Sequence, residues 1–158
     1  MNYTYLDSPL GRLLIAGDEQ GLRSIHFPHN EQPAKAADSW NASDSGLKLA
    51  CDQLREYFLG QRQHFDLVLA PDASAFQSQV LEQLLAIPFG QTRSYGQLAH
   101  ILERPKAARA VGTACARNPL PIVIPCHRVI GQNGSLTGFA GGIEAKRWLL
   151  DHERAPRS

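Results

Sequence analysis

The sequence has few cysteines and no run of hydrophobic residues long enough to cross a membrane. A membrane span needs roughly 20 consecutive apolar residues, and neither such a run nor a signal-peptide pattern at the N-terminus occurs in the 158 residues. The three cysteines, Cys51, Cys115 and Cys126, form no CxxC pair, and an odd number cannot all be bridged to one another. We therefore expect a cytoplasmic protein with at least one free thiol.

Patterns for metals and cofactors are also weak. The candidate ligands of the first 70 residues, His26, His29, Cys51 and His64, are scattered rather than grouped at the spacing of a zinc site. A glycine-rich stretch covers residues 131–142, but its spacing is not that of a phosphate-binding loop. We expect surface histidines, no metal site and no cofactor.

Charge is distributed unevenly along a chain whose formal net charge is only +1. Residues 1–85 hold 6 Lys and Arg and 11 Asp and Glu, which gives a net charge of −5. Residues 86–158 hold 10 Lys and Arg and 4 Asp and Glu, which gives a net charge of +6. A cationic half suits a polyanionic partner that docks on one face of the molecule. Chance drift between the halves of a small protein is the alternative explanation.

The first half of the chain predicts a small lobe of strands and one helix. A hydrophobic content of 43% over 158 residues supports one domain or two small lobes that share a core. Runs rich in Tyr, Leu and Ile alternate with turn residues and predict an antiparallel meander over residues 2–7, 12–17 and 21–27. Beyond it we expect a loop over residues 28–46, a helix over 46–59 and a strand over 64–69.

The second half predicts mainly helices. Ser74 is a typical N-cap and begins a helix that extends to Ala86. A last helix over residues 142–152 is expected to bury Ile143, Trp148 and Leu149. Between them, residues 95–102 and 106–117 predict two helices joined by a short turn, with Leu98, Ile101 and Leu102 facing inward. This is the helix-turn-helix arrangement of DNA-binding proteins, which many other proteins also contain.

The second helix of this pair is nearly devoid of long side chains. Small residues dominate residues 106–117, and the long cationic side chains are those of Lys106, Arg109 and Arg117. Such a surface allows close approach of the backbone, which the narrow minor groove of DNA requires and the wide major groove does not. We expect Arg109 to enter a minor groove with little dependence on base sequence; packing of the alanines against the core is the alternative.

A β-branched run, Ile122–Ile124, predicts a buried strand that Pro125 ends. The next residue, Cys126, would then be exposed where the chain leaves the core, which suggests a chemical role. His127 is the obvious base, but neighbours in sequence rarely point the same way, so a bridging water is expected between the two side chains. Glu153, Asp151 or Glu144 could orient the histidine.

These residues resemble those of the O6-alkylguanine-DNA alkyltransferases (methylated-DNA–protein-cysteine methyltransferases). The resemblance is specific from about Phe76 to Glu153 and looser over residues 1–70. The resemblance is carried by the motif Pro125-Cys126-His127-Arg128-Val129-Ile130. Asn118-Pro119 precedes this motif, and the glycine-rich loop and Trp148-Leu149-Leu150 follow it.

The resemblance implies a reaction and its residues. Cys126 would accept the alkyl group of O6-alkylguanine, and of O4-alkylthymine as well, in an irreversible displacement, so that each molecule reacts once. His127 would deprotonate Cys126 through a water and be held by Glu153, while Asn118 would brace the strand and loop around the cysteine. A flipped base is required because the alkylated oxygen is inaccessible to a thiol inside the duplex.

The resemblance also implies a fold and a DNA interface. It predicts a ribonuclease-H-like lobe over residues 1–72 and, over 73–158, a helical alkyl-acceptor domain with a winged-helix-like helix-turn-helix. Tyr95 would rotate the target nucleotide and Arg109 would fill the gap in the duplex. Further contacts with DNA would come from Ser94, Ala107, Ala108 and Gly112. The base pocket would be lined by Cys115, Pro121, Val129, Phe139 and Ala140. The protein would act as a monomer on double-stranded DNA.

The chain departs from the family pattern, and two other functions also fit its residues. Phe139 stands where many members have tyrosine, so the pocket lacks that hydroxyl group, and Cys115 could serve packing alone. A related group that only binds lesions has tryptophan in place of the cysteine, but this chain keeps Cys126. A cysteine hydrolase would turn over repeatedly, and a helix-turn-helix regulator would bind selected sequences without needing the thiol.

Overall fold

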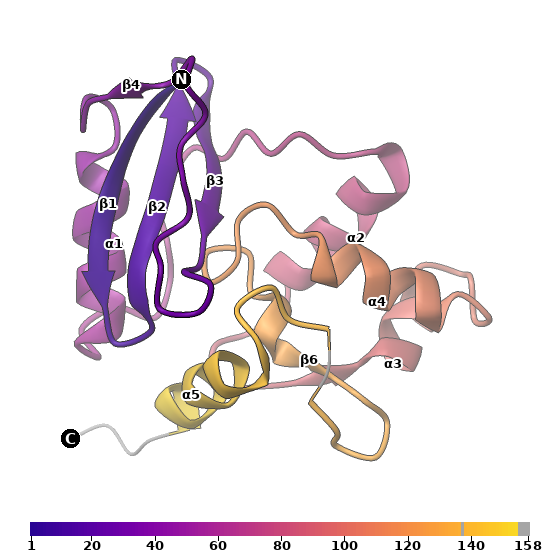
Figure 1. The fold of residues 1–158 in the computed structure, drawn as a ribbon. Coiled ribbons are helices and arrows are strands. Elements are labelled where there is room, and N and C mark those ends of the chain that lie inside the picture. The colour runs from indigo at the N-terminus through magenta and orange to yellow at the C-terminus, as the bar shows by residue number, and fades with distance from the viewer. Residues whose placement is uncertain (137, 155–158) are drawn as a thin grey trace. The chain divides into compact units, whose positions relative to one another are not determined.

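The structure is a computed structural model that describes residues 1–136 and 138–154 (Figure 1). Thr137, in the predicted glycine-rich loop, and residues 155–158 lie outside the described part. The chain divides into two compact units, Met1–Asp72 and Ala73–Ser158. Within the described residues, no helix combines the length and the apolar character that a membrane span requires.

The first unit contains the predicted meander. Strands β1 (Asn2–Ser8), β2 (Gly11–Asp18) and β3 (Gly21–His26) pair in antiparallel fashion. A two-residue strand, β4 (Asn41–Ala42), interrupts the predicted loop and pairs in parallel with β1, so the strand order is β3-β2-β1-β4. The central strand β2 is buried from Leu13 to Gly17, which makes it the core of this sheet.

Helix α1 (Lys48–Phe58) lies against the sheet of the first unit (Figure 1). Its buried side chains include Leu54 and Tyr57, so the predicted helix is confirmed. The strand predicted over residues 64–69 is wrong. In this segment only Leu69 forms a bridge, and its partner is Leu22. The N–H of Leu22 donates to the carbonyl of Val68, and the carbonyl of Leu22 accepts from the N–H of Ala70, each at 2.9 Å. The segment touches the edge of β3 at one point and does not continue along it.

The second unit is mainly helical. It contains α2 (Ala75–Leu85), α3 (Tyr95–Ile101), α4 (Ala108–Ala116) and α5 (Ile143–Arg154), with a two-stranded parallel sheet of β5 (Arg93–Ser94) and β6 (Val129–Ile130). Ser74 caps α2 as predicted, because its hydroxyl accepts from the N–H of Gln77 at 3.1 Å. Ser94 caps α3 in a complete capping box with Gln97.

The predicted helix pair is present, with small corrections. Helix α4 begins at Ala108, two residues after the predicted start, and Ala107 occupies its N-cap position. Two residues predicted to face inward do not: the side chains of Ile101 and Ile143 are 52% and 48% exposed. Ile101 is the last residue of α3 and Ile143 is the first residue of α5, so each stands at the end of its helix. Leu98, Val111 and Leu149 are fully buried and form part of the core of this unit.

Candidate active site

Residues 121–124 form a turn and not the predicted strand. Pro121 and Ile124 make one isolated bridge, and the N–H of Ile124 donates to the carbonyl of Leu120 at 2.8 Å. Ile122 has a φ of 76°, which β-branched residues rarely adopt and which an extended strand does not allow. The apolar run that predicted a strand instead reflects burial, because Ile122, Val123 and Ile124 all lie in the interior.

Asn118 holds this turn from inside. Its Nδ2 donates to the carbonyl of Ile124 at 2.8 Å, and its Oδ1 accepts from the N–H of Leu120 at 2.9 Å. Asn118 is buried, so both bonds form in a region of low dielectric where an unpaired amide would be costly. The side chain therefore ties the two sides of the turn together immediately before Cys126.

Cys126 begins a single 3-10 turn, η1 (Cys126–Arg128), and is only 2% exposed. The expectation of an exposed thiol is wrong, because every residue from Leu120 to Val129 is buried and the chain does not leave the interior at Pro125. Burial raises the pKa of Cys126 to about 11, although a hydrogen bond from Asn118 and the charge of Lys146 act in the opposite direction. Cys126 is therefore a neutral thiol in the resting protein.

His127, Arg128 and Glu153 form a buried network between η1 and α5. Nε2 of His127 lies 2.7 Å from Oε2 of Glu153. The guanidinium of Arg128 donates to both carboxylate oxygens, at 2.8 Å to Oε1 and 3.0 Å to Oε2, and to the carbonyl of Ile87 at 2.7 Å. Of the three acids proposed from the sequence, only Glu153 is in this network; Glu144 and Asp151 are exposed.

Electrostatics in the network determine which nitrogen of His127 carries the proton. Burial raises the pKa of Glu153, but the hydrogen bonds and charges of His127 and Arg128 outweigh it and leave that pKa well below its usual range. Burial lowers the pKa of His127, against the opposing effect of Glu153. A neutral imidazole beside a carboxylate donates through the nitrogen that faces it. Nε2 of His127 is therefore the protonated nitrogen, and Nδ1 carries the lone pair.

Nδ1 of His127 is buried and has no hydrogen-bond partner among the described residues. The ring of Phe139 stands edge-on to the imidazole, with centroids 6.5 Å apart and planes at 87°. Apolar packing on one side and the carboxylate on the other fix the orientation of the ring. The arrangement is that of a base whose acceptor nitrogen is buried.

Tyr95 and Lys146 form a second polar pair in the same unit. Nζ of Lys146 donates to the hydroxyl of Tyr95 at 3.3 Å and lies 5.6 Å from the centroid of its ring. Gly138 has a φ of 67°, and a Cβ atom there would lie 3.3 Å from the Tyr95 hydroxyl. Glycine thus allows both the backbone conformation and the close approach of the loop to this phenol.

A depression of about 610 Å³ lies along α4. Four residues predicted to contact DNA line it: Tyr95, Ala108, Arg109 and Gly112. The other lining residues are Gly96, Thr113, Ala116, Gln132 and Gly138. A Cβ atom at Gly112 would meet the Tyr95 ring at 3.8 Å, an ordinary contact, so the ring packs directly on the helix backbone. Ser94 and Ala107, also predicted to contact DNA, occupy the N-cap positions of α3 and α4.

The predicted base-pocket residues differ in their exposure. Pro121, Val129, Cys115 and Phe139 are buried, and Ala140 is exposed. Burial and the neighbouring Cys126 raise the pKa of Cys115 to about 12, whereas Lys146 lowers it. Cys115 is thus a neutral thiol, as Cys126 is.

Sequence reasoning missed Arg128 and Lys146, two buried cations that contact the site. Arg128 belongs to the motif at residues 125–130, and Lys146 lies in the helix predicted over residues 142–152. Lys146 and Glu153 are seven residues apart, so they lie two turns apart on one face of α5. A charged residue at each end of an otherwise apolar helical face is the signal that could have found Lys146.

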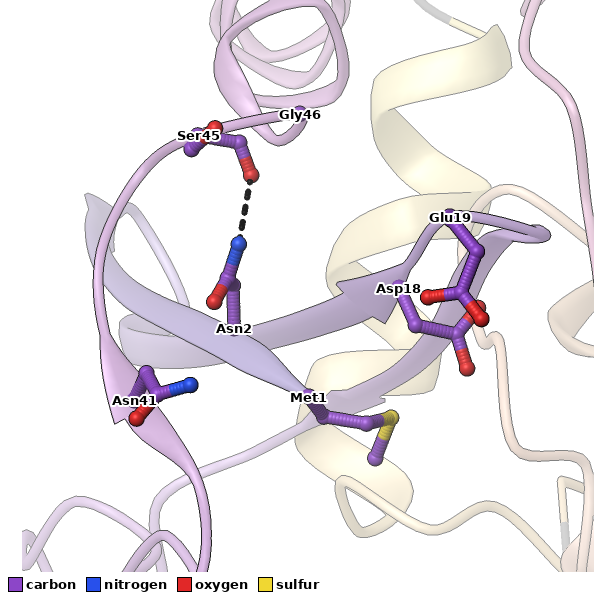
Figure 2. A pocket seen from close by; sticks show the side chains of 7 residues that line it. All are labelled: Met1, Asn2, Asp18, Glu19, Asn41, Ser45 and Gly46. Atoms are coloured by element: carbon purple, nitrogen blue, oxygen red, sulfur yellow. Dashed lines mark hydrogen bonds between the residues drawn. The ribbon is translucent and has the colours of Figure 1, made fainter.

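The first unit has a pocket of its own, of about 390 Å³ (Figure 2). It is lined by Met1, Asn2, Asp18, Glu19, Asn41, Ser45 and Gly46. Asn2 donates to the carbonyl of Ser45 at 3.2 Å, and the Asp18 carboxylate is paired with Arg23 at 2.9 Å. No group of three His, Cys, Asp or Glu side chains suited to a metal occurs within the described residues. This pocket shows no arrangement for chemistry.

Comparison with protein families matches both units of the chain. Residues 75–155 match the DNA binding domain of 6-O-methylguanine DNA methyltransferase, and residues 1–71 match the ribonuclease-like domain of the same protein. The two matches together span nearly the whole chain.

Individual relatives are similar along their full length. A methylated-DNA–protein-cysteine methyltransferase of Methanosarcina acetivorans is 45% identical over 97% of this chain and 98% of its own. The crystal structure of Mycobacterium tuberculosis OGT in complex with DNA superimposes with a TM-score of 0.89 at 43% identity, over 98% of this chain and 93% of that one. The crystal structure of O6-methylguanine-DNA methyltransferase from Pyrococcus kodakaraensis gives a TM-score of 0.66 at 25% identity, over 98% of this chain and 99% of that one. The chain belongs to the 6-O-methylguanine DNA methyltransferase family.

Proposed function

We propose that this protein repairs double-stranded DNA by transferring the alkyl group of O6-alkylguanine to Cys126. The observation that carries the proposal is the buried thiol next to an imidazole whose acceptor nitrogen is Nδ1 and whose other nitrogen is bound to Glu153. Membership of the family and the named activity of its relatives support the same function.

The reaction is a direct displacement at carbon. His127 takes the thiol proton on Nδ1 through a bridging water, and the Cys126 sulfur then attacks the alkyl carbon. A sulfur–carbon bond forms as the carbon–O6 bond breaks, and the electron pair passes to the guanine, which takes up a proton from solvent and remains in the DNA as the repaired base. Glu153 stabilises the imidazolium formed at His127, and Arg128 keeps that carboxylate ionised and in place.

The burial of Cys126 requires that the damaged base leave the helix. A side chain that is 2% exposed cannot reach an atom stacked inside a duplex, so the base must enter the protein. Tyr95 rotates the target nucleotide, and Arg109 fills the space that it leaves. Phe139, Ala140, Val129, Pro121 and Cys115 form the surroundings of the flipped base. Extrusion costs a few kcal/mol, and less for a mispaired lesion.

The surface of α4 supports binding in the minor groove. Ala108 and Gly112 leave the backbone accessible along the depression, and Arg109 projects from the same helix. With few long polar side chains on this surface, binding depends little on base sequence. In this proposal α3 and α4 are the helix pair of a winged-helix-like domain, and the first unit has a ribonuclease-H-like fold.

The product limits each molecule to one reaction. A thioether at Cys126 is stable, and among the described residues none is placed to remove the alkyl group from the sulfur. We propose that the protein is consumed stoichiometrically, that it acts as a monomer in the cytoplasm without a cofactor, and that O4-alkylthymine is a second substrate.

Mass spectrometry after incubation with a duplex that contains O6-methylguanine tests the proposal. We expect a gain of one CH2 unit on the peptide that contains Cys126, with at most one methyl group per molecule. Cys126→Ser should take up no methyl group, whereas the matched variant Cys51→Ser should react like the wild type. Methylation of another residue, or repeated turnover on a peptide or ester substrate, would contradict the proposal.

A further inference from the structure

Thr113 is an exposed polar residue of α4, a helix otherwise composed largely of small and apolar residues. It lines the depression that contains Tyr95 and Arg109, on the surface proposed to enter the minor groove. Ala108 and Gly112, which line the same depression, carry no polar side chain. In α4, all of which the structure describes, the hydrogen-bonding side chains that line the depression are therefore those of Arg109 and Thr113.

The hydroxyl group of Thr113 has a defined direction. Its Oγ1 lies 3.2 Å from the carbonyl oxygen of Arg109, one turn earlier in the helix. A carbonyl oxygen has no proton, so the threonine is the donor in this bond. The hydroxyl proton is thus directed at the helix backbone, and the lone pairs of Oγ1 remain for a partner at the surface. Thr113 offers an acceptor, whereas the guanidinium of Arg109 offers donors alone.

The position of this acceptor is fixed by packing on the other side of the helix. Nε2 of Gln77, on α2, donates to the carbonyl of Ala114 at 3.4 Å and to the carbonyl of Arg117 at 3.0 Å. Val111 and Ala114 are buried on either side of Thr113 in the sequence. The end of α4 that carries Thr113 is therefore held before DNA binds, and contact with a base requires no rearrangement of the backbone.

Base pairs present few hydrogen-bond donors in the minor groove. Adenine N3 and thymine O2 are acceptors, and the donor is the N2 amino group of guanine. An acceptor on α4 matches that amino group and keeps its bond to Arg109. Opposite an A·T pair the hydroxyl group of Thr113 would meet another acceptor, and it could donate to the base only by giving up the bond to Arg109.

We propose that Thr113 accepts a hydrogen bond from the N2 amino group of a guanine beside the lesion and so gives repair a preference for a neighbouring G·C pair. This inference rests on the proposed alkyl transfer and adds a sequence context to it. Thr113 lies four residues from Arg109, which is about 6 Å along the helix axis. Base pairs are spaced by about 3.4 Å, so if Arg109 fills the gap, Thr113 faces a pair no more than about two steps away.

Modified bases test the contact with the N2 amino group directly. Inosine differs from guanine only in lacking this group, and 2,6-diaminopurine differs from adenine only in having it. In duplexes that contain O6-methylguanine, the two pairs on either side of the lesion are changed one at a time, and the rate of methyl transfer is measured below saturation. At one position we expect guanine to be favoured over inosine, and 2,6-diaminopurine over adenine, by about fivefold.

Variants of Thr113 separate this contact from the effect of the amino group on the duplex itself. Thr113→Val keeps the branched shape but has no lone pair, so the ratio of the rates for guanine and inosine should fall by about fivefold relative to the wild type. Thr113→Ala, which favours the helix, should show the same loss. Thr113→Ser retains a hydroxyl group that can donate to the Arg109 carbonyl, and it should keep the preference.

Three results would overturn the inference. They are a wild-type rate that does not rise with the amino group at any position, a wild-type ratio in Thr113→Val and Thr113→Ala, and loss of the preference in Thr113→Ser. The last would mean that the methyl group of Thr113 makes the contact and not its hydroxyl group. Absence of methyl transfer by the wild type on every duplex is a different outcome, because it would refute the proposed function itself.

Discussion

Glu153 accepts hydrogen bonds from two buried side chains, His127 and Arg128, and is itself buried. Glu153→Gln removes the charge and leaves Arg128 without its counter-ion. Loss of one partner of a buried pair costs about 3–5 kcal/mol, so we expect the free energy of unfolding to fall by about 3 kcal/mol in chemical denaturation. Asp7→Asn, which breaks an exposed pair with Arg12, is the control and should change stability little. An equally small effect at Glu153 would show that the network is not stabilising.

The stability that Glu153 provides should depend on pH. Its pKa is lower in the folded than in the unfolded protein, so the unfolded chain binds more protons at acid pH. This contribution is fully present above the unfolded value of about 4.3 and is lost as pH falls below it. Denaturation of the wild type and Glu153→Gln between about pH 6 and 3 should therefore show a difference that narrows toward acid. A difference that stays constant would mean that the charge is not responsible.

At the scale of elements, Ser74 and Ser94 provide a matched comparison, because they cap α2 and α3 through the same type of hydrogen bond. In each cap the serine Oγ lies 3.1 Å from the backbone nitrogen of a glutamine. Substitution of either serine by alanine should lower the free energy of unfolding by about 1 kcal/mol. Only Ser94→Ala should also weaken binding to duplex DNA, since α3 begins with Tyr95 at the proposed interface. Binding can be measured by fluorescence anisotropy, and equal losses of affinity would argue against a specific role for α3.

Two arginines, Arg109 on α4 and Arg117 at its C-cap, line different depressions. Arg109 lines the depression that contains Tyr95, and Arg117 lines another of about 360 Å³ with Phe76 and Gln77. If Arg109 enters the minor groove, Arg109→Ala should weaken binding to duplex DNA by about tenfold without changing stability, because this side chain is exposed. Arg117→Ala should have a smaller effect. Unchanged affinity in Arg109→Ala would refute the proposed intrusion.

At the scale of the whole molecule, the positive charge of residues 86–158 predicts binding that depends on salt. Contacts with phosphate release counterions, so the affinity for undamaged duplex DNA should fall at least about tenfold between 50 and 200 mM salt. Duplexes of unrelated sequence should bind with similar affinity. A strong preference for one sequence would instead favour a helix-turn-helix regulator.

Local patterns were enough to predict most elements and to single out the residues proposed to react. Alternation and turn residues predicted β1 to β3, capping serines and apolar periodicity predicted α2 and α3, and the motif at residues 125–130 singled out Cys126 and His127. These signals act over a few residues, so they can be recognised without knowing what packs against them. The failures at Ile122–Ile124 and residues 64–69 arose because an apolar run indicates burial as readily as it indicates a strand.

The environment of the Cys126 thiol was decided only by the tertiary structure. The packing of α5 against η1 and α3 decides three features of the site. It decides whether Cys126 is exposed and whether Lys146 keeps its charge in the interior. It also decides that Glu153, rather than Asp151 or Glu144, meets His127. Burial changes the energy of a charge by more than any local preference does. The sequence alone determined which groups can react, and the packing of helices far apart in the chain decided their protonation states and their partners.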